Sequence, residues 1–224
     1  MEIKIKNNWD DLSWKEYEQL DQILNANIPQ AFKTVNIISL LSGVSVEELE
    51  NLPIIEFQRL LPEINFIDTK PNLRSHQTEY IVNGREYSFV GNVDEITTSQ
   101  YIDYRSYMNE EVKDVVNLMS VFLIPKGHKY NDGYNMDQVK SDIGDMCWLD
   151  VRAAAFFFRI WLGEYILILK YSLIKELKKL KKGKKKEESK KLAQQIKQVE
   201  EYFNSSASSL LSSKFVNIQT PLSM

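Results

Sequence analysis

The sequence contains few of the residues that build metal centres and nucleophilic sites. Its 224 residues include one cysteine, Cys147, and two histidines, His76 and His128. A single cysteine excludes an intramolecular disulfide framework, and these three residues offer no cluster of soft ligands at metal-binding spacing. We therefore expect no disulfide, no structural zinc site and no cofactor.

Signals for export and for membrane insertion are also lacking. The first residues, MEIKIKNNWDD, contain no apolar signal-peptide core, so we expect the chain to stay in a reducing cytoplasm. The apolar run 153–169 is 17 residues long and includes Arg159 and Glu164, whereas a membrane span needs about 20 residues largely free of charge. We expect this run to form a helix buried nearly all round, in the core or at a subunit contact.

No recognisable catalytic set appears. Cys147 lies in DMCWLD, which favours a small packed side chain, while His128 lies in a turn-rich loop and His76 in a linker-like stretch. The paired carboxylates are explained by helix caps and solvated faces, and KKGKKK has neither the spacing nor the terminal hydroxyl of a phosphate-binding loop. We expect a non-enzymatic protein without a small-molecule substrate.

Charge is distributed unevenly. Residues 172–191 contain ten lysines and three glutamates, a local charge of +7, and the remainder of the chain has a net charge of −10. A solvated helical surface is our first interpretation of this basic tip. The alternatives are contact with DNA phosphates and pairing with the acidic part of a neighbouring copy. The lysines of the tip are Lys178, Lys179, Lys181, Lys182, Lys184, Lys185 and Lys186.

Three capping-box patterns predict helix starts. In each, a Ser or Thr is followed three residues later by Glu or Gln, and apolar residues flank the pattern as a hydrophobic staple requires. The pairs are Ser13 with Glu16, Ser45 with Glu48, and Thr97 with Gln100.

Strand signals are confined to two stretches. Residues 2–6 alternate charged and apolar side chains, and residues 79–90, EYIVNGREYSFV, form two β-rich runs around Asn83-Gly84. Asn-Gly is the strongest short hairpin signal because both residues tolerate positive φ. We expect a small antiparallel sheet.

The remaining periodic segments predict helices. Residues 35–64 are expected to form short helices broken at Gly43, Pro53 and Pro62. Further helices are expected over 112–124, 136–143, 150–182 and 187–203, with Gly183 reversing or kinking the last pair.

The end of the chain changes character. Residues 205–213, SSASSLLSS, have the composition of a flexible linker, and residues 214–224 follow it with several apolar side chains. We expect this tail to dock on a neighbouring subunit by strand addition, with a frayed terminus as the alternative. Its expected contact residues are Phe215, Val216, Ile218 and Leu222, and those of the apolar helix are Phe156, Phe157, Trp161 and Tyr165.

These elements predict an α+β fold that is predominantly α-helical. A small antiparallel sheet accompanies N-terminal helices and is followed by a long C-terminal helical hairpin and an extended tail. We expect three parts: a mixed domain over 1–149, the hairpin over 150–204, and the linker with its docking tail over 205–224.

Three runs of the sequence resemble segments of known proteins. The runs EYIVNGREYSFVGNVDEITTSQYIDYRSYM and LMSVFLIPKGHKYNDGYNMDQVKSDI resemble a segment found among structural genes of tailed phages of Bacteroides-type bacteria, including crAss-like phages. The run VNIISLLSGVSVEELENLPIIEFQRLL is similar to helical segments of small tail-assembly and head-to-tail proteins. Together they span about half the chain, residues 35–143.

The resemblance implies a virion structural protein, made in the host cytoplasm and present in several copies in the portal, collar or tail ring. Its expected partners are copies of itself and other phage structural proteins. DNA contact through the lysine tip stays open, and no membrane partner is expected. The alternatives are a tail-assembly chaperone that leaves before maturation and a basic-tipped nucleic-acid-binding module.

Overall fold

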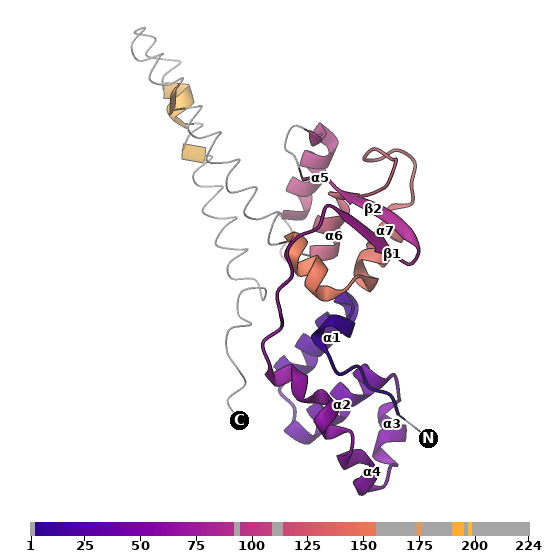
Figure 1. Cartoon of the computed structure of the whole chain (residues 1–224). Coiled ribbons are helices and arrows are strands. Elements are labelled where there is room, and N and C mark those ends of the chain that lie inside the picture. The colour runs from indigo at the N-terminus through magenta and orange to yellow at the C-terminus, as the bar shows by residue number, and fades with distance from the viewer. Residues whose placement is uncertain are drawn as a thin grey trace.

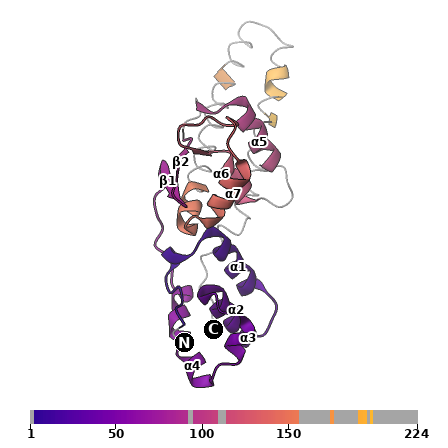
Figure 2. The same cartoon turned by 90° about the vertical axis from the view of Figure 1, so that its right-hand side faces the viewer.

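The computed structural model describes residues 3–91, 95–108, 114–155, 174–175, 190–194 and 197–198. The described body has two ends that meet at α1 (Trp14–Asn25), as Figures 1 and 2 show. Helices of the N-terminal third occupy one end. The β-hairpin occupies the other with α5 (Thr98–Met108), α6 (Val115–Ser120) and α7 (Met136–Asp145). One cluster of buried apolar side chains runs through both ends, from Ile5 to Ala154.

The N-terminal end consists of short helices separated by turn residues. They are the 3-10 turn η1 (Trp9–Asp11), α1 (Trp14–Asn25), α2 (Gln30–Ser42), α3 (Val46–Glu50), α4 (Ile54–Gln58) and the 3-10 helix η2 (Leu61–Asp68). The breaks predicted at Gly43, Pro53 and Pro62 are confirmed: Gly43 caps α2 with φ 72°, Pro53 precedes α4, and Pro62 lies in the first turn of η2.

All three capping boxes are confirmed. The cap hydroxyl accepts from the amide three residues later at 3.2–3.3 Å, and the longer side chain accepts from the cap amide at 2.9–3.1 Å. They begin α1, α3 and α5 (Thr98–Met108). Gln100 is also buried, and its amide donates to the carbonyl of Val121 at 2.9 Å, so this cap attaches α5 to the core.

The predicted hairpin is confirmed, and a third strand joins it. β1 (Glu79–Val82) pairs antiparallel with β2 (Arg85–Phe89), which pairs antiparallel with β3 (Leu123–Pro125). The small antiparallel sheet beside mostly helical surroundings is therefore as expected.

Two predicted elements were wrong in type or extent. Residues 3–7 run extended but form no strand; the Lys6 amide instead donates to the Leu41 carbonyl of α2 at 3.1 Å. Their alternation reflects an extended segment that packs Ile3 and Ile5 against helices. The helix expected over 112–124 is shorter, because α6 (Val115–Ser120) ends before the apolar run that becomes β3.

The last described elements return to the start of the chain. α7 (Met136–Asp145) confirms the amphipathic helix predicted there, and a further helix is described over residues 148–155. Between them, the backbone amide of Trp14 donates to the Met146 carbonyl at 2.8 Å, and the backbone amide of Trp148 donates to the Leu12 carbonyl at 3.0 Å. This short antiparallel bridge joins the two ends of the body.

Aromatic rings fill the junction beside that bridge. The Trp148 ring is fully buried, stacks on Tyr17 with a centroid distance of 4.2 Å, and donates from Nε1 to the Trp9 carbonyl at 2.7 Å. Trp9 in turn contacts Phe66 edge-on and donates to the Thr69 carbonyl at 3.0 Å. These bonds satisfy both indole N–H groups, so the rings pack at the junction without leaving those donors unpaired.

Candidate interaction surface on the β-hairpin

The hairpin turn sets the register of the sheet. Asn83 and Gly84 adopt φ angles of 50° and 75°, the positive pair that a two-residue hairpin turn requires. Val82 then pairs with Arg85, Ile81 with Glu86, Tyr80 with Tyr87, and so on along the ladder. Because side chains alternate between faces, this register places Tyr80 and Val82 on the buried face and Glu79 and Ile81 on the outer face.

A buried carboxylate fixes the hairpin to α7. Asp142 is fully buried and accepts from Arg85 Nη1 at 2.8 and 3.0 Å, from Asn83 at 3.0 Å and from the Tyr87 hydroxyl. Gln138, one turn earlier in α7, donates to it at 3.1 Å. Burial alone raises the pKa of Asp142, but these hydrogen bonds outweigh burial and hold the pKa below its usual range. The carboxylate is therefore charged and fully engaged in holding β1 and β2.

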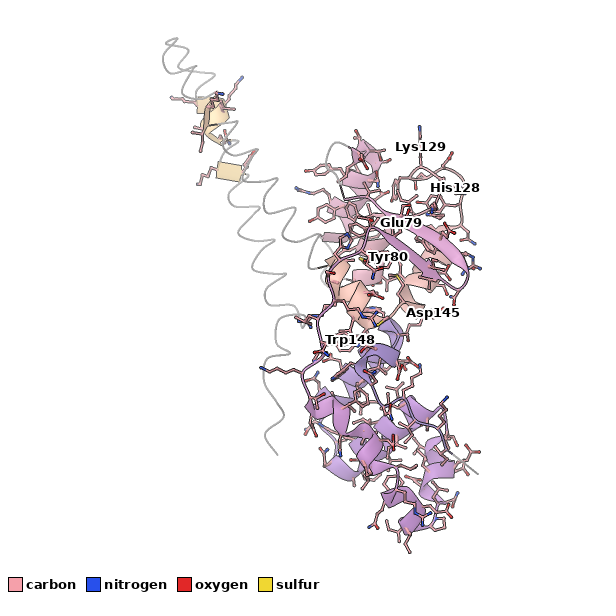
Figure 3. All side chains as sticks on the ribbon, in the orientation of Figure 1. Glu79, Tyr80, His128, Lys129, Asp145 and Trp148 are labelled. Atoms are coloured by element: carbon pink, nitrogen blue, oxygen red, sulfur yellow. The ribbon has the colours of Figure 1, made fainter. Side chains whose placement is uncertain are left out.

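A second carboxylate links the hairpin to α1. Asp145 accepts from Lys15 of α1 at 2.9 Å and from Asn83 at 3.0 Å. The hydrogen bond from Lys15 lowers the pKa of Asp145. Figure 3 shows Asp145 and Trp148 between the hairpin and the N-terminal helices. Asn83 of the turn is thus bonded to Asp142 and Asp145 of α7 and, through Asp145, linked to Lys15 of α1.

β1 forms a free edge of the sheet in the described part of the chain. Val82 and Arg85 flank a two-residue turn and form a hydrogen-bonded pair, so Ile81 and Glu86 form a non-hydrogen-bonded pair. The 2.8 Å bond from the Phe89 amide to the Thr78 carbonyl confirms this phase. The N–H and C=O groups of Glu79 and Ile81 consequently point away from β2, and no described residue bonds to them there.

The outer face of the hairpin combines an apolar side chain with charges. Ile81 is 76% exposed, the largest value among the large apolar side chains found exposed in the described residues. Lys126 lies near Glu86, the cross-strand neighbour of Ile81, and pairs with Glu86 at 2.8 Å and with Glu79 at 3.5 Å. An exposed apolar residue on an unpaired edge is the feature that other strands recognise.

The other exposed large apolar side chains of the described residues are Ile28, Phe32, Ile54, Ile55, Leu73, Tyr101 and Ile102. Ile54 and Ile55 lie in the first turn of α4, where the amides have no intrahelical partner, but a helix terminus offers no ladder of alternating N–H and C=O groups to an added strand. The remaining side chains lie in helices or in segments outside the sheet. The hairpin edge is therefore the better-defined candidate surface.

An open groove lies in the N-terminal end. Its volume is about 1260 Å3, and its lining includes the extended segment 3–7, the end of α2 and residues near the start of η2. Two of its charged groups pair with each other, Lys6 with Glu16 at 2.6 Å, and Glu63 accepts from Asn7 at 2.7 Å. We assign this groove no role.

The residues singled out as weak catalytic candidates have structural surroundings. His76 packs edge-on against Phe89, lies 3.2 Å from the Tyr80 hydroxyl, and has its pKa lowered by burial. His128 is exposed in the loop after β3, where Figure 3 shows it beside Lys129, and contacts the Tyr134 ring edge-on. Cys147 is partly buried, its pKa is raised by burial, and its thiol donates to the Asp10 carbonyl at 3.5 Å.

Every partner-binding residue predicted from the sequence lies outside the described residues. This holds for the apolar-helix set Phe156, Phe157, Trp161 and Tyr165, for the tail set Phe215, Val216, Ile218 and Leu222, and for the lysine tip from Lys178 to Lys186. Their roles stay predictions. The hairpin edge was not predicted as an interaction surface, although the alternation of side chains along the predicted hairpin places Ile81 on the face opposite Tyr80 and Val82.

Comparison with known proteins gives no relative: no family model, no curated protein and no solved structure matches this chain. Within the described ranges, no helix is long and apolar enough to cross a bilayer, and no group of three or more acidic, histidine or cysteine side chains is placed to hold a metal ion.

Proposed function

We propose that this chain works by assembly, as a structural component of a tailed-phage particle that binds further copies of itself and other structural proteins. A position in the portal, collar or tail ring follows from the resemblance of residues 35–143. The observation that supports assembly most directly is the anchored free edge of β1, which presents Ile81 and unpaired backbone groups together.

The physical reason is the cost of leaving such an edge open. Proteins usually protect an edge strand with charge, proline, a bulge or a covering element, because unpaired N–H and C=O groups template pairing with other chains. Here the outward position nearest the turn is Ile81, and the strand contains no proline. Charge is present at Glu79, but the turn-proximal half of this rigid edge presents the apolar Ile81, which suits a polypeptide partner.

The charge of the described body favours protein over nucleic acid as its partner. Residues 3–91, 95–108 and 114–155 contain 13 basic and 21 acidic side chains, a net charge of −8. A surface of this sign repels phosphate backbones, whereas DNA binding requires clustered lysine or arginine. Contact with DNA would have to come from the lysine tip.

Native mass determination of the purified full-length chain tests assembly. We expect a defined oligomer, or a concentration-dependent series, that reverts to monomer when residues 214–224 are removed. A monomer in both forms, at every accessible concentration and on addition of the portal protein, would overturn assembly as the function.

Quantitative proteomics of purified virions separates the structural protein from the chaperone. A structural component is expected at a fixed ratio to the portal protein. Oligomers in solution combined with no chain in virions would favour a tail-assembly chaperone instead.

A further inference from the structure

We infer that the free edge of β1 is the docking site for residues 214–220 of a neighbouring copy, which add a fourth strand to the sheet. This inference rests on the proposed function, because it requires several copies in one assembly. It assigns a receptor to the tail and an occupant to the edge.

The backbone of β1 supplies the main attraction. Glu79 and Ile81 direct two N–H and two C=O groups away from β2, and no described residue bonds to them there. An added strand satisfies these groups in either direction, parallel or antiparallel. Strand addition of this kind takes its affinity from the main chain and its specificity from alternate side chains.

The side-chain pattern of the segment fits the outer face. Residues 214–220, KFVNIQT, contain no proline, and Pro221 follows them as a residue that cannot donate to a ladder. Val216 and Ile218 are two positions apart, so in a strand they share one face. Placed on the outer face, one of them lies opposite Ile81 and the other diagonal to it, and together they remove its apolar surface from water.

Charge favours this tail over a second copy of the same edge. Lys214 is the only charged side chain in residues 205–224. The outer face of the edge has Glu79 and Glu86, which share Lys126 and so leave one net negative charge. Pairing two β1 edges brings these glutamates together, whereas the tail brings a lysine. The acidic sign of the described body acts in the same direction.

The receptor is also organised before binding. Asp142 holds Arg85, Tyr87 and the turn residue Asn83, so the hairpin backbone is fixed by α7. A partner that adds to a fixed edge loses only its own conformational freedom, which improves affinity compared with two flexible segments.

Cysteine cross-linking in the full-length chain tests the inference. Cys147 is first replaced by serine, and then chains with Ile81→Cys are mixed with chains carrying Val216→Cys or Ile218→Cys under mild oxidation. Because each chain has one cysteine, a heterodimer reports contact between copies. We expect heterodimer yield at least about five-fold above that of the controls, since a disulfide needs Cα atoms within about 7 Å.

Two controls match the geometry. The first control mixes chains carrying Glu86→Cys with chains carrying Val216→Cys or Ile218→Cys. Glu86 lies opposite Ile81 on the same face but on β2, so it is about 9.6 Å from the added strand, beyond disulfide reach. Asn217→Cys, mixed with Ile81→Cys, lies on the other face of the added strand. Both pairs are expected to give only background cross-linking, and circular dichroism of each variant checks that it is folded.

Three results would overturn the inference. Homodimers of Ile81→Cys as the main product would show pairing of two β1 edges. Cross-linking only within a chain that carries both cysteines would place the tail on its own copy. Suppose that native mass determination shows assembled chains but all cysteine pairs give equal yields, or none gives a yield above background. This docking site would then be excluded, while the proposed assembly function would stand. A chain that never assembles would instead contradict the proposed function itself.

Discussion

Tyr80 and Ile81 are neighbours in β1, yet they lie in opposite environments. Tyr80 is 6% exposed, packs into the core and has a pKa raised by burial to about 12, whereas Ile81 is 76% exposed. The inner face of the hairpin is held by apolar packing and by the Asp142 network, and the outer face by surface ion pairs. The inner face therefore provides the contacts that stabilise the strand, and the outer face leaves Ile81 available to the proposed partner.

The same contrast separates two carboxylates of α7. Asp142 is buried with four side-chain partners, while Asp145 is 41% exposed and pairs with a lysine that is itself 53% exposed. Exposed pairs contribute little because water and salt screen them, whereas removing one member of a buried network leaves its partners unsatisfied. Stability should depend on the buried network and be nearly indifferent to the exposed pair.

The largest expected effect comes from breaking that network. Asp142→Ala removes the acceptor of Tyr87 and Arg85, and we expect it to lower the free energy of unfolding by about 3 kcal/mol, near the lower limit for buried pairs because Arg85 is half-exposed. Asp145→Ala is the matched control, with an expected loss of about 1 kcal/mol or less. Urea unfolding measures both, and equal losses would contradict the contrast.

Neighbouring residues of β1 provide a sharper comparison. Val82→Ala removes buried methyl groups from the inner face, and we expect a loss of about 2 kcal/mol. Ile81→Ala removes exposed methyl groups, and the expected change is within about 0.5 kcal/mol. A large loss for Ile81→Ala in the monomer would mean that its side chain packs within the fold and is not available to a partner.

A smaller effect is expected at the turn. Gly84 has φ 75°, and a Cβ there meets no atom within 4 Å, so substitution by alanine is opposed by backbone strain alone. We expect Gly84→Ala to cost about 1–2 kcal/mol and Gly84→Asn less, because asparagine tolerates the left-handed region. Thermal unfolding of both variants checks the order, and equal melting temperatures would contradict it.

The pH dependence of stability tests the charge state of Asp142. Its folded pKa is lowered from 3.8, so around and below that pH the unfolded state binds more protons, and the stability it contributes is lost as pH falls through the folded pKa. The difference in unfolding free energy between the native protein and Asp142→Asn should be full near neutral pH and shrink below pH 3.8. Burial raises the pKa of Glu16 but hydrogen bonds outweigh it, and hydrogen bonds also lower the pKa of Glu48. Both residues are present in the two proteins, so their contributions cancel in the difference. A difference that grows on acidification would contradict a lowered pKa.

Prediction from the sequence succeeded where the determining contacts are local. The three capping boxes, the Asn-Gly turn and the breaks at Gly43, Pro53 and Pro62 all act within a few residues, and each lies where it was expected. Prediction failed where a distant partner decides. Residues 3–7 lacked a strand partner, and the apolar run at 121–125 is compatible with helix or strand until β2 is present to pair with it.

The candidate surface shows the same division. Alternation along EYIV and the Asn-Gly turn predict which side chains share a face with Ile81, but that α7 packs on the opposite face is decided by the tertiary structure. The interpretation of the paired carboxylates as caps and solvated faces was wrong for Asp142, which is fully buried, because an aspartate in an amphipathic helix is usually solvated. Its role depends on Arg85 and Tyr87, more than 50 residues away in the chain.

By itself, the sequence determined where helices begin, where the chain turns, and that residues 172–191 are basic while the rest of the chain is acidic, because capping, positive φ and charge count need no distant partner. Only the tertiary structure decided that residues 12–14 and 146–148 bridge the two ends, that a third strand completes the sheet, and that Asp142 is buried beneath the hairpin. These features depend on contacts between segments far apart in sequence, and such contacts form only when the whole core packs together.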